Sequence, residues 1–574
     1  MNTLLTRWGR ALDRDKPLPE YPRPQFRREG WMNLNGVWEY AIYKQGEGFD
    51  NQGAFNGYQG EIVVPFSPES YLSGVGKTLK PDECLFYRRK FKLEPGFLKH
   101  TTLLHFGAVD HKCWVYINDE LVWAHVGGFT PFTIDISTYV IPGLNEIRVE
   151  ATDPTDTSWA SRGKQSSRPG GIWYPPQSGI WQTVWLECLP EGYLPGVRME
   201  PDIDRAVIRV TPGGDCTAVF QGQTFELRAN EAYDIPVSDM RLWSPEDPYL
   251  YDVAFECGED RVQSYFGMRK FSLGKDANGT PRLMLNNAPY FHNGLLDQGY
   301  WPDGLLTAPG DEALLYDIRT CKALGFNMLR KHIKIEPLRW YYHCDREGML
   351  VWQDMVNGGS KYNFGVIGVL PFLGVRLSDG PGNYGRFGRA DAAGRAQYYE
   401  ELGRMLEHLQ NCVSLAMWVP FNEGWGQFDA NRAVDFIRAR DTSRTIDHAS
   451  GWHDQGGGDC VSPHIYFTKL KAPRRRGGRA FALSEFGGYS HAVEGHVRNP
   501  GKVFGYKKFK TLGDLRGAYA NLFEKQVIPL MDRGLSAAVY TQVSDVEDEV
   551  NGLMTYDRAV VKITSPQAPW PRAR

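Results

Sequence analysis

The chain has 574 residues, enough for three or four domains at roughly 100–200 residues each. Its formal net charge of -3 lacks the strong basic excess that nucleic-acid-binding proteins usually carry. Hydrophobic residues make up 42% of the chain and charged residues 23%, a composition that supports large buried cores and argues against intrinsic disorder.

No secretory or membrane segment is visible in the sequence. The first residues contain no apolar stretch long enough for a signal peptide. The longest apolar run, residues 364–375, is about half as long as a membrane-spanning helix. The 9 cysteines include no Cys-x-x-Cys pair, which argues against both a zinc ribbon and a disulfide framework. We therefore expect a cytoplasmic protein with reduced thiols and no nucleic-acid or membrane partner.

The first third of the chain predicts a β-sandwich. Residues 1–30 are rich in Arg and Pro and show no periodicity, so we expect an arm that lies over the surface. Short segments rich in β-branched and aromatic residues follow, separated by turn signals, at 36–42, 86–93, 103–106, 113–117 and 146–150. No helical period appears among them, so residues 1–190 are assigned to one sandwich domain with its arm.

The next two regions predict a smaller sandwich and an α/β domain. Residues 191–275 repeat the pattern of short strands on a scale that suits an immunoglobulin-like β-sandwich. From 276 to 574 apolar strands alternate with amphipathic helices, and eight strands can be counted. This pattern predicts a (β/α)8 TIM barrel. No helix is evident between Ser450 and Ser462, so a doubly wound open sheet fits the same pattern.

Two predicted barrel strands end in glutamate. The fourth strand ends at Glu423 and the seventh at Glu485, and glycines follow both residues. Barrel enzymes carry their chemistry where strands end. Two carboxylates that meet at such a site suit glycoside hydrolysis, in which one donates a proton to the leaving oxygen and the other attacks the anomeric carbon. The alternative for either glutamate is an ion pair with arginine or a helix cap.

Several motifs together resemble glycoside hydrolase family 2, the family of β-galactosidases, β-glucuronidases and β-mannosidases. Residues 115–119, 127–132 and 178–187 resemble strands of its sugar-binding jelly-roll domain. Residues 243–251 and 266–271 resemble its immunoglobulin-like domain, and residues 325–330 and 352–354 resemble barrel strands two and three. The resemblance implies three domains: a jelly-roll β-sandwich, an immunoglobulin-like β-sandwich and a TIM barrel. It also implies a homodimer.

The resemblance also implies residue roles. Glu423 matches the acid/base and Glu485 the nucleophile, while Asn422 would hydrogen-bond the sugar 2-hydroxyl. Arg330 and Tyr466 match residues near the nucleophile. An arginine there would lower the pKa of the nucleophile, while burial near a tryptophan would raise the pKa of the acid.

Other candidates for substrate contact lie at or near the predicted strand ends. His332 lies two residues after Arg330, whereas the sugar-contacting histidine of the family usually lies three after. Trp425 suits either the floor of a sugar subsite or loop packing, and Asp297 either a sugar contact or a solvated loop acid. Gln542 stands where family members often have tryptophan. We interpret His464 as structural and the acidic run 545–549 as a solvated face.

The sequence indicates the reaction more specifically than it indicates the substrate sugar. Glucuronidases of the family hold the sugar carboxylate with an Asn-x-Lys pair, and no such pair occurs here. We therefore expect a retaining, exo-acting β-glycosidase that is most like a β-galactosidase, with no cofactor and no metal. Glucuronide, galacturonide and arabinoside substrates stay open. The rival classes are a non-catalytic carbohydrate-binding protein and a metal-dependent barrel hydrolase.

Overall fold

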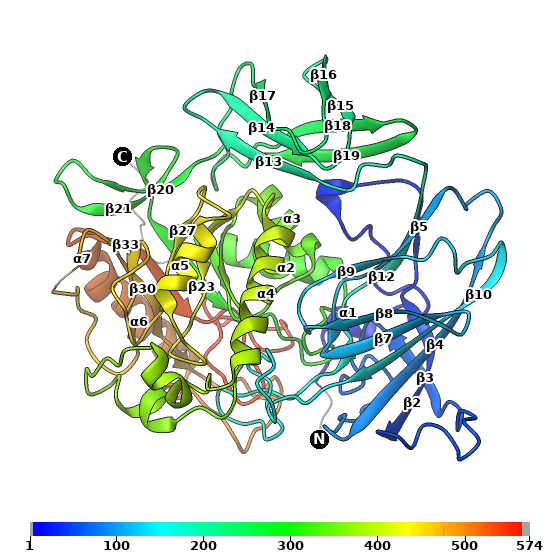
Figure 1. Cartoon of the computed structure of the whole chain (residues 1–574). Coiled ribbons are helices and arrows are strands. Elements are labelled where there is room, and N and C mark those ends of the chain that lie inside the picture. Colours follow the sequence, from blue (N-terminus) through cyan, green and yellow to red (C-terminus); the bar gives the residue numbers. More distant parts are fainter. Residues whose placement is uncertain (1–3, 475, 565–574) are drawn as a thin grey trace.

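The computed structural model describes residues 4–474 and 476–564. Figure 1 shows the N-terminal sandwich, drawn in blue and cyan, beside a C-terminal barrel drawn from green to red, with the second sandwich against both. Across the described residues, no helix combines the length and the apolar character that a membrane span requires. The apolar run at 364–375 instead contains a single turn of helix, Gly365–Val369, and exposed side chains such as Phe364 and Leu373.

The N-terminal sandwich packs two antiparallel sheets face to face around one hydrophobic core. In the larger sheet, β10 (Gly143–Thr152) alternates buried and partly buried side chains because one face meets the core. The smaller sheet contains β1 (Trp31–Asn33), β12 (Val184–Leu189), β5 (Thr101–Phe106) and β9 (Phe132–Asp135). The smaller-sheet strands β5 and β12 are buried throughout. The larger contains β3 (Gly60–Val64), β2 (Gly36–Lys44), β4 (Glu83–Leu93), β10, β7 (Lys112–Ile117) and β8 (Glu120–Val126).

The second sandwich has a separate core and two smaller sheets. One holds β13 (Val197–Asp202), β14 (Val207–Pro212) and β17 (Tyr233–Pro236). The other holds β16 (Gln223–Leu227), β15 (Cys216–Phe220), β18 (Tyr251–Cys257) and β19 (Asp260–Phe266). A three-stranded sheet of β20 (Phe271–Lys275), β21 (Pro281–Leu285) and β22 (Ala288–Pro289) follows and packs apolar side chains against the inside of the barrel.

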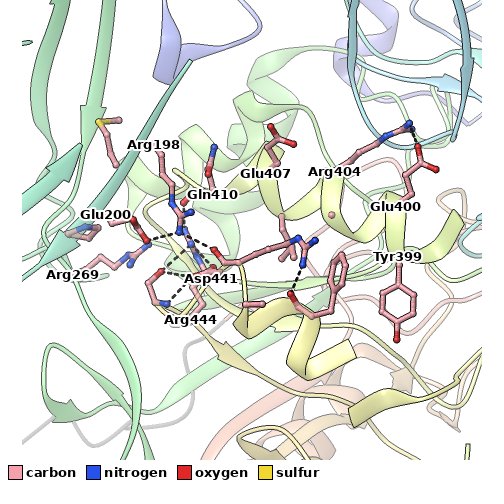
Figure 2. A pocket seen from close by; sticks show the side chains of 18 residues that line it. Arg198, Glu200, Arg269, Tyr399, Glu400, Arg404, Glu407, Gln410, Asp441 and Arg444 are labelled. Carbon is pink, nitrogen blue, oxygen red and sulfur yellow. Dashed lines mark hydrogen bonds and ion pairs between the residues drawn. The ribbon is translucent and has the colours of Figure 1, made fainter. Parts of the chain in front are cut away.

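A groove of about 660 Å³ separates the second sandwich from the barrel helices α4 (Ala392–Leu409) and α5 (Ala430–Arg438) (Figure 2). Ion pairs line it, including Arg198 with Glu200 at 2.7 Å and Arg444 with Asp441 at 2.8 Å. Arg444 also donates to the carbonyl of Leu415, at the start of a barrel strand. The groove therefore lies at the opposite end of the strands from the two glutamates.

The C-terminal region is a parallel eight-stranded barrel. The strand order is β27 (Thr445–Ile446), β26 (Leu415–Val419), β25 (Leu350–Asp354), β24 (Met328–Lys331), β23 (His292–Asp297), β33 (Leu535–Thr541), β30 (Ala480–Gly487) and β28 (Cys460–Val461). An isolated bridge between Gly451 and Pro463 spans the remaining gap, where the sequence shows no helix. The barrel prediction is therefore confirmed over the open-sheet alternative, and β29 (His464–Ile465) adds a further pairing with β30.

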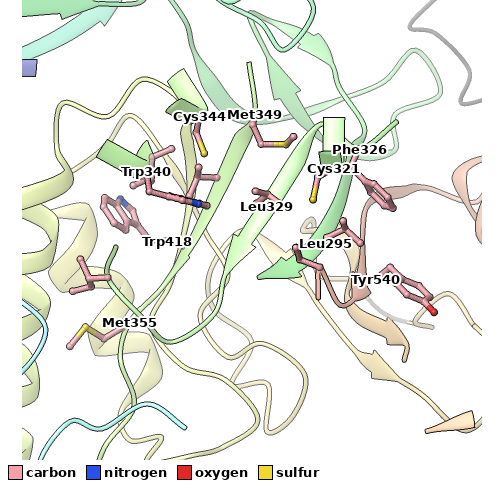
Figure 3. Packing of buried hydrophobic residues seen from close by; sticks show 14 of the residues in the cluster. Leu295, Cys321, Phe326, Leu329, Trp340, Cys344, Met349, Met355, Trp418 and Tyr540 are labelled. Carbon is pink, nitrogen blue, oxygen red and sulfur yellow. The ribbon is translucent and has the colours of Figure 1, made fainter. Parts of the chain in front are cut away.

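Helices cover the outside of the barrel. The predicted amphipathic segments form α2 (Asp311–Ala323), α3 (Leu338–Glu347), α4, α5 and α6 (Leu512–Leu522). Alternate strand residues face them, and Figure 3 shows Leu295 and Leu329 on the strands with Trp340 and Cys344 of α3 nearby. Leu296, the next residue of β23, faces the barrel interior instead. This alternation decides which residues at a strand end can reach the mouth of the barrel.

Candidate active site

Glu423 follows β26 in an unusual backbone conformation. Its φ is 49°, in the left-handed region, and its amide donates to the carbonyl of Ser450 at 2.9 Å. Asn422 forms an isolated parallel bridge with the same Ser450. Non-glycine residues in this region cost roughly 1–3 kcal/mol and occur preferentially at functional sites. The Glu423 side chain is nevertheless buried, at 7% exposure, so its carboxyl group is held inside the protein.

Glu485 reaches the same place from β30. The ladder between β30 and β33 shifts register between Leu483 and Phe486, so Glu485 lies inside a bulge. A bulge redirects side chains that regular alternation would place on the other face of a strand. The carboxylate of Glu485 is buried, at 4% exposure.

His464 of β29 lies between the two glutamates. One ring nitrogen, Nδ1, is 2.7 Å from Oε1 of Glu423, and the other, Nε2, is 3.7 Å from Oε1 of Glu485. One ligand atom from each of the three residues lies within 4.8 Å of the others. The sequence reading of His464 as a structural residue was therefore incomplete, because this ring contacts the acidic pair directly.

Two further groups hold the carboxylate of Glu485. Arg330 donates from Nη1 to Oε1 at 3.2 Å, and the hydroxyl of Tyr466 donates to Oε2. Arg330 is itself fixed by a bidentate pair with Asp354, at 2.9 and 3.0 Å. Burial acts to raise the pKa of Glu485, but the electrostatic interactions with His464 and Arg330 outweigh it, so the pKa lies below its ordinary value.

The pKa of Glu423 moves in the opposite direction. Burial raises it, and the interaction with His464 offsets that effect only in part. The ionised carboxylate of Glu485 adds to the rise, because a second negative charge nearby disfavours ionisation. One carboxyl group is therefore stabilised as the acid and the other as the anion.

Asn422 presents a free donor beside this pair. Its Oδ1 accepts from Nη2 of Arg330 at 2.7 Å, while its Nδ2 is buried without a partner among the described residues. His332 bonds Asp354 through Nδ1 at 2.7 Å. Trp425 places its ring 6.0 Å from that of His332 and 5.2 Å from that of Trp173, a residue of the N-terminal sandwich. A buried amide donor without a partner suits a polar ligand group.

Comparison with known proteins shows a resemblance to one family. Residues 73–190 match the model described as glycosyl hydrolases family 2, sugar binding domain, and residues 207–269 match that described as glycosyl hydrolases family 2. Both matched regions, which lie in the two sandwich domains, therefore resemble glycoside hydrolase family 2. A β-galactosidase of Leuconostoc mesenteroides is 23% identical over 532 residues, which cover 80% of this chain and 46% of that protein. A putative β-glucuronidase of Formosa agariphila is 22% identical over 373 residues, 60% of this chain and 32% of that protein.

Solved structures of the family share the fold over nearly the whole chain. A β-glucuronidase of Ruminococcus gnavus superposes with a TM-score of 0.72 at 15% identity, covering 95% of this chain and 97% of that one. A β-galacturonidase of Eisenbergiella tayi gives a TM-score of 0.67 at 18% identity, covering 94% and 96%. The chain spans less than half of the curated relatives named above, so its substrate cannot be transferred from them.

Two residues expected to contact substrate have their polar groups bonded to other side chains. Asp297 accepts from Nζ of Lys331 at 2.7 Å, and both belong to the strand faces that meet the helices, so Asp297 does not join the acidic pair. Gln542 accepts from Gln298 and donates to Glu549 and Asn551, which uses both of its N–H donors. Gln542 therefore positions Glu549 and has no free N–H donor for a sugar.

Two residues at the site carried no local sequence signal. Glu549 belongs to the acidic run expected to be solvated, yet it is 2% exposed because the loop after β33 folds inward. Lys164 comes from the N-terminal sandwich, and its charge acts on Glu423 and His332. Only the packing of one domain on another brings Lys164 to the barrel.

The site also offers ligands to a metal ion. Glu423, His464 and Glu485 form the one group of three or more His, Cys, Asp or Glu side chains so placed in residues 4–474 and 476–564. Nitrogen and carboxylate ligands suit zinc and similar ions. An ion bound there would occupy both carboxylates, so the expectation of a metal-independent protein stays a prediction, to be tested with a chelator.

Proposed function

We propose that this chain is a retaining, exo-acting β-glycosidase of family 2, most like a β-galactosidase. The proposal rests on one observation: carboxylate oxygens of Glu423 and Glu485 lie within 4.8 Å of each other, and the pKa values of the two groups move apart. Carboxyl groups about 5–5.5 Å apart suit direct attack on the anomeric carbon, whereas inverting enzymes need about 6.5–9.5 Å to admit a water.

In the first step, the ionised Glu485 attacks the anomeric carbon as the bond from that carbon to the leaving oxygen breaks. Glu423 gives its proton to the leaving oxygen, and a glycosyl ester on Glu485 results. In the second step, Glu423 removes a proton from a water that attacks the same carbon. The carboxylate of Glu485 departs, the sugar is released with its configuration retained, and both groups return to their starting states.

The surrounding residues fit this sequence of steps. Arg330 and Tyr466 hold Glu485 ionised and oriented before attack. The free Nδ2 of Asn422 is the natural donor to the sugar 2-hydroxyl, because its Oδ1 is already bonded to Arg330. A hydrogen bond to that hydroxyl strengthens in the transition state and so adds to the rate.

The choice of galactoside rests on two weaker supports. Curated relatives of this chain include β-galactosidases, and the sequence lacks an Asn-x-Lys pair. Glucuronides, galacturonides and arabinosides are the alternatives, since structural neighbours include β-glucuronidases and a β-galacturonidase. A non-catalytic carbohydrate-binding protein is the second candidate from another class.

The direct test is a panel of nitrophenyl β-glycosides of galactose, glucuronic acid, galacturonic acid, arabinose, mannose and fucose. We expect turnover of at least one, with the β-anomer of the free sugar as the first product by NMR. Glu485→Gln should lower kcat/KM by at least about 10²–10⁴-fold while leaving the circular dichroism spectrum unchanged. Sugar binding without any turnover would favour the carbohydrate-binding protein, and a first-formed α-anomer would exclude retention.

A further inference from the structure

Lys164 is a buried lysine whose ammonium group has no hydrogen-bond partner. It is 6% exposed, and no described residue accepts a hydrogen bond from its Nζ. Its position is nevertheless fixed, because its carbonyl accepts from the amide of Tyr174 at 2.9 Å. The amides of Arg162 and Gly163 donate to the carbonyl of Asn357, just beyond β25, which ties this loop of the N-terminal sandwich to the barrel. A lysine carries three donors, so this ammonium can still donate to a bound ligand.

A glycine brings the loop this close. Gly163 has a φ of 62°, and a Cβ added to it would lie 3.0 Å from the carbonyl oxygen of Ile333. Ile333 follows His332 directly, so the loop passes over the end of β24. The Nζ of Lys164 then lies 5.8 Å from the ring of Trp425 and 5.2 Å from the ring of Tyr174.

Glu549 is the acidic neighbour of Lys164. The two charged groups are 3.9 Å apart, which is too long for a hydrogen bond. Glu549 accepts from the hydroxyl of Tyr174 at 3.1 Å and from Nε2 of Gln542 at 3.0 Å, so two donors fix its carboxylate. Burial raises the pKa of Glu549, the charge of Lys164 lowers it in part, and the charge of Glu485 adds to the rise. A fixed acceptor and an unused donor therefore stand side by side next to the proposed nucleophile.

We propose that Lys164 and Glu549 bind the glycosyl group and select a neutral sugar over the matching uronic acid. The ammonium donates to one sugar hydroxyl, and the carboxylate accepts from a neighbouring one. This inference rests on the proposed function and names the substrate class of the same site.

Charge decides between the two classes of sugar. Lys164 is the cation without a strong partner here, because Arg330 already bonds Asp354 and Glu485. A uronate carboxylate near Lys164 would meet the acceptor oxygens of Glu549 beside it and the ionised Glu485 close by. Like charges at such short range inside a protein are strongly unfavourable. A neutral sugar satisfies both the donor and the acceptor without that repulsion.

The test compares matched substrates on the full chain. We expect kcat/KM for the 4-nitrophenyl galactoside to exceed that for the galacturonide by at least ~100-fold, and likewise glucoside over glucuronide, because a buried group left unpaired or repelled rejects an analogue strongly. Lys164→Met should lower kcat/KM for the neutral glycosides by ~10²-fold or more. Arg168→Met, an exposed cation on the same loop, serves as the matched control and should leave it unchanged.

A second variant separates recognition from mere loss of structure. Glu549→Gln removes the repulsion, so the ratio of uronide to neutral turnover should rise by ~10-fold or more, whereas a folding defect would lower both rates together. Product inhibition of the wild type needs no variant: galactose should inhibit more strongly than galacturonate. A wild type that prefers uronides, or a Lys164→Met enzyme with unchanged kcat/KM, would overturn the inference. A wild type that hydrolyses no member of either pair would instead count against the proposed function.

Discussion

Replacing Glu423 by glutamine tests the assignment of the acid most sharply. With an ionised Glu485 within 4.8 Å, a second negative charge on Glu423 would cost about 3.5 kcal/mol at an effective dielectric constant near 20. This repulsion keeps the proton on Glu423 as long as Glu485 is ionised. Activity should therefore fall as pH drops through the lowered pKa of Glu485 and fall again as pH rises through the raised pKa of Glu423.

The assay compares two leaving groups. Glu423→Gln should lower kcat/KM for a phenyl glycoside by about 10²–10⁴-fold, because the departing oxygen needs a proton. The 2,4-dinitrophenolate group departs without a proton, so the first step on a 2,4-dinitrophenyl glycoside should slow by less than ~10-fold. The alkaline limb, which is the fall in activity as pH rises, should disappear in this variant. Glu407→Gln, an exposed glutamate of α4, is the control. Equal losses on both substrates, or an alkaline limb that survives the substitution, would refute the assignment of Glu423 as the acid.

Three further outcomes are expected. Asn422→Ala should lower kcat/KM by ~10–100-fold on ordinary glycosides but little on 2-deoxyglycosides, measured with matched nitrophenyl substrates, because only the 2-hydroxyl contact is lost. Dialysis against EDTA should leave kcat/KM unchanged, and a loss restored by one added divalent ion would show instead that the Glu423, His464 and Glu485 group holds a required metal. Leu329→Ala should lower the unfolding free energy by about 2–5 kcal/mol in denaturant titration, since this side chain is fully buried between strand and helices; a change below 1 kcal/mol would show that the cavity collapses.

Residues whose position follows from a single strand or helix were predictable from the sequence. Glu423 and Glu485 each follow an apolar run, and the carboxyl ends of parallel strands meet at one end of a barrel. The helix period of α2 appears directly in the spacing of Leu314, Ile318 and Cys321. Predicting these features requires only the local periodicity and the rule that parallel barrel strands all end on the same side of the barrel.

The side on which a strand-end residue lies was not predictable. Asp297 ends β23 at the correct height for a substrate contact, but Leu296 faces the barrel interior, so Asp297 faces the helices and pairs with Lys331. A one-residue shift in the register of β23 would have turned Asp297 toward the barrel interior. Glu485 is the opposite example, because its carboxylate does reach the site. A bulge that cannot be recognised in the sequence directs it there.

The contribution of the N-terminal sandwich to the site depends on packing between domains. The amide of Gly163 and the ring of Trp173 contact barrel residues that are distant in the sequence, Asn357 and Trp425. These contacts place the ammonium of Lys164 and the hydroxyl of Tyr174 beside Glu549, so the barrel alone would lack both groups. Under the proposed function, the acid and the nucleophile come from the barrel, whereas sugar recognition belongs to the sandwich and the barrel together. Loss of the sandwich should therefore remove substrate selection even where the two glutamates keep their geometry.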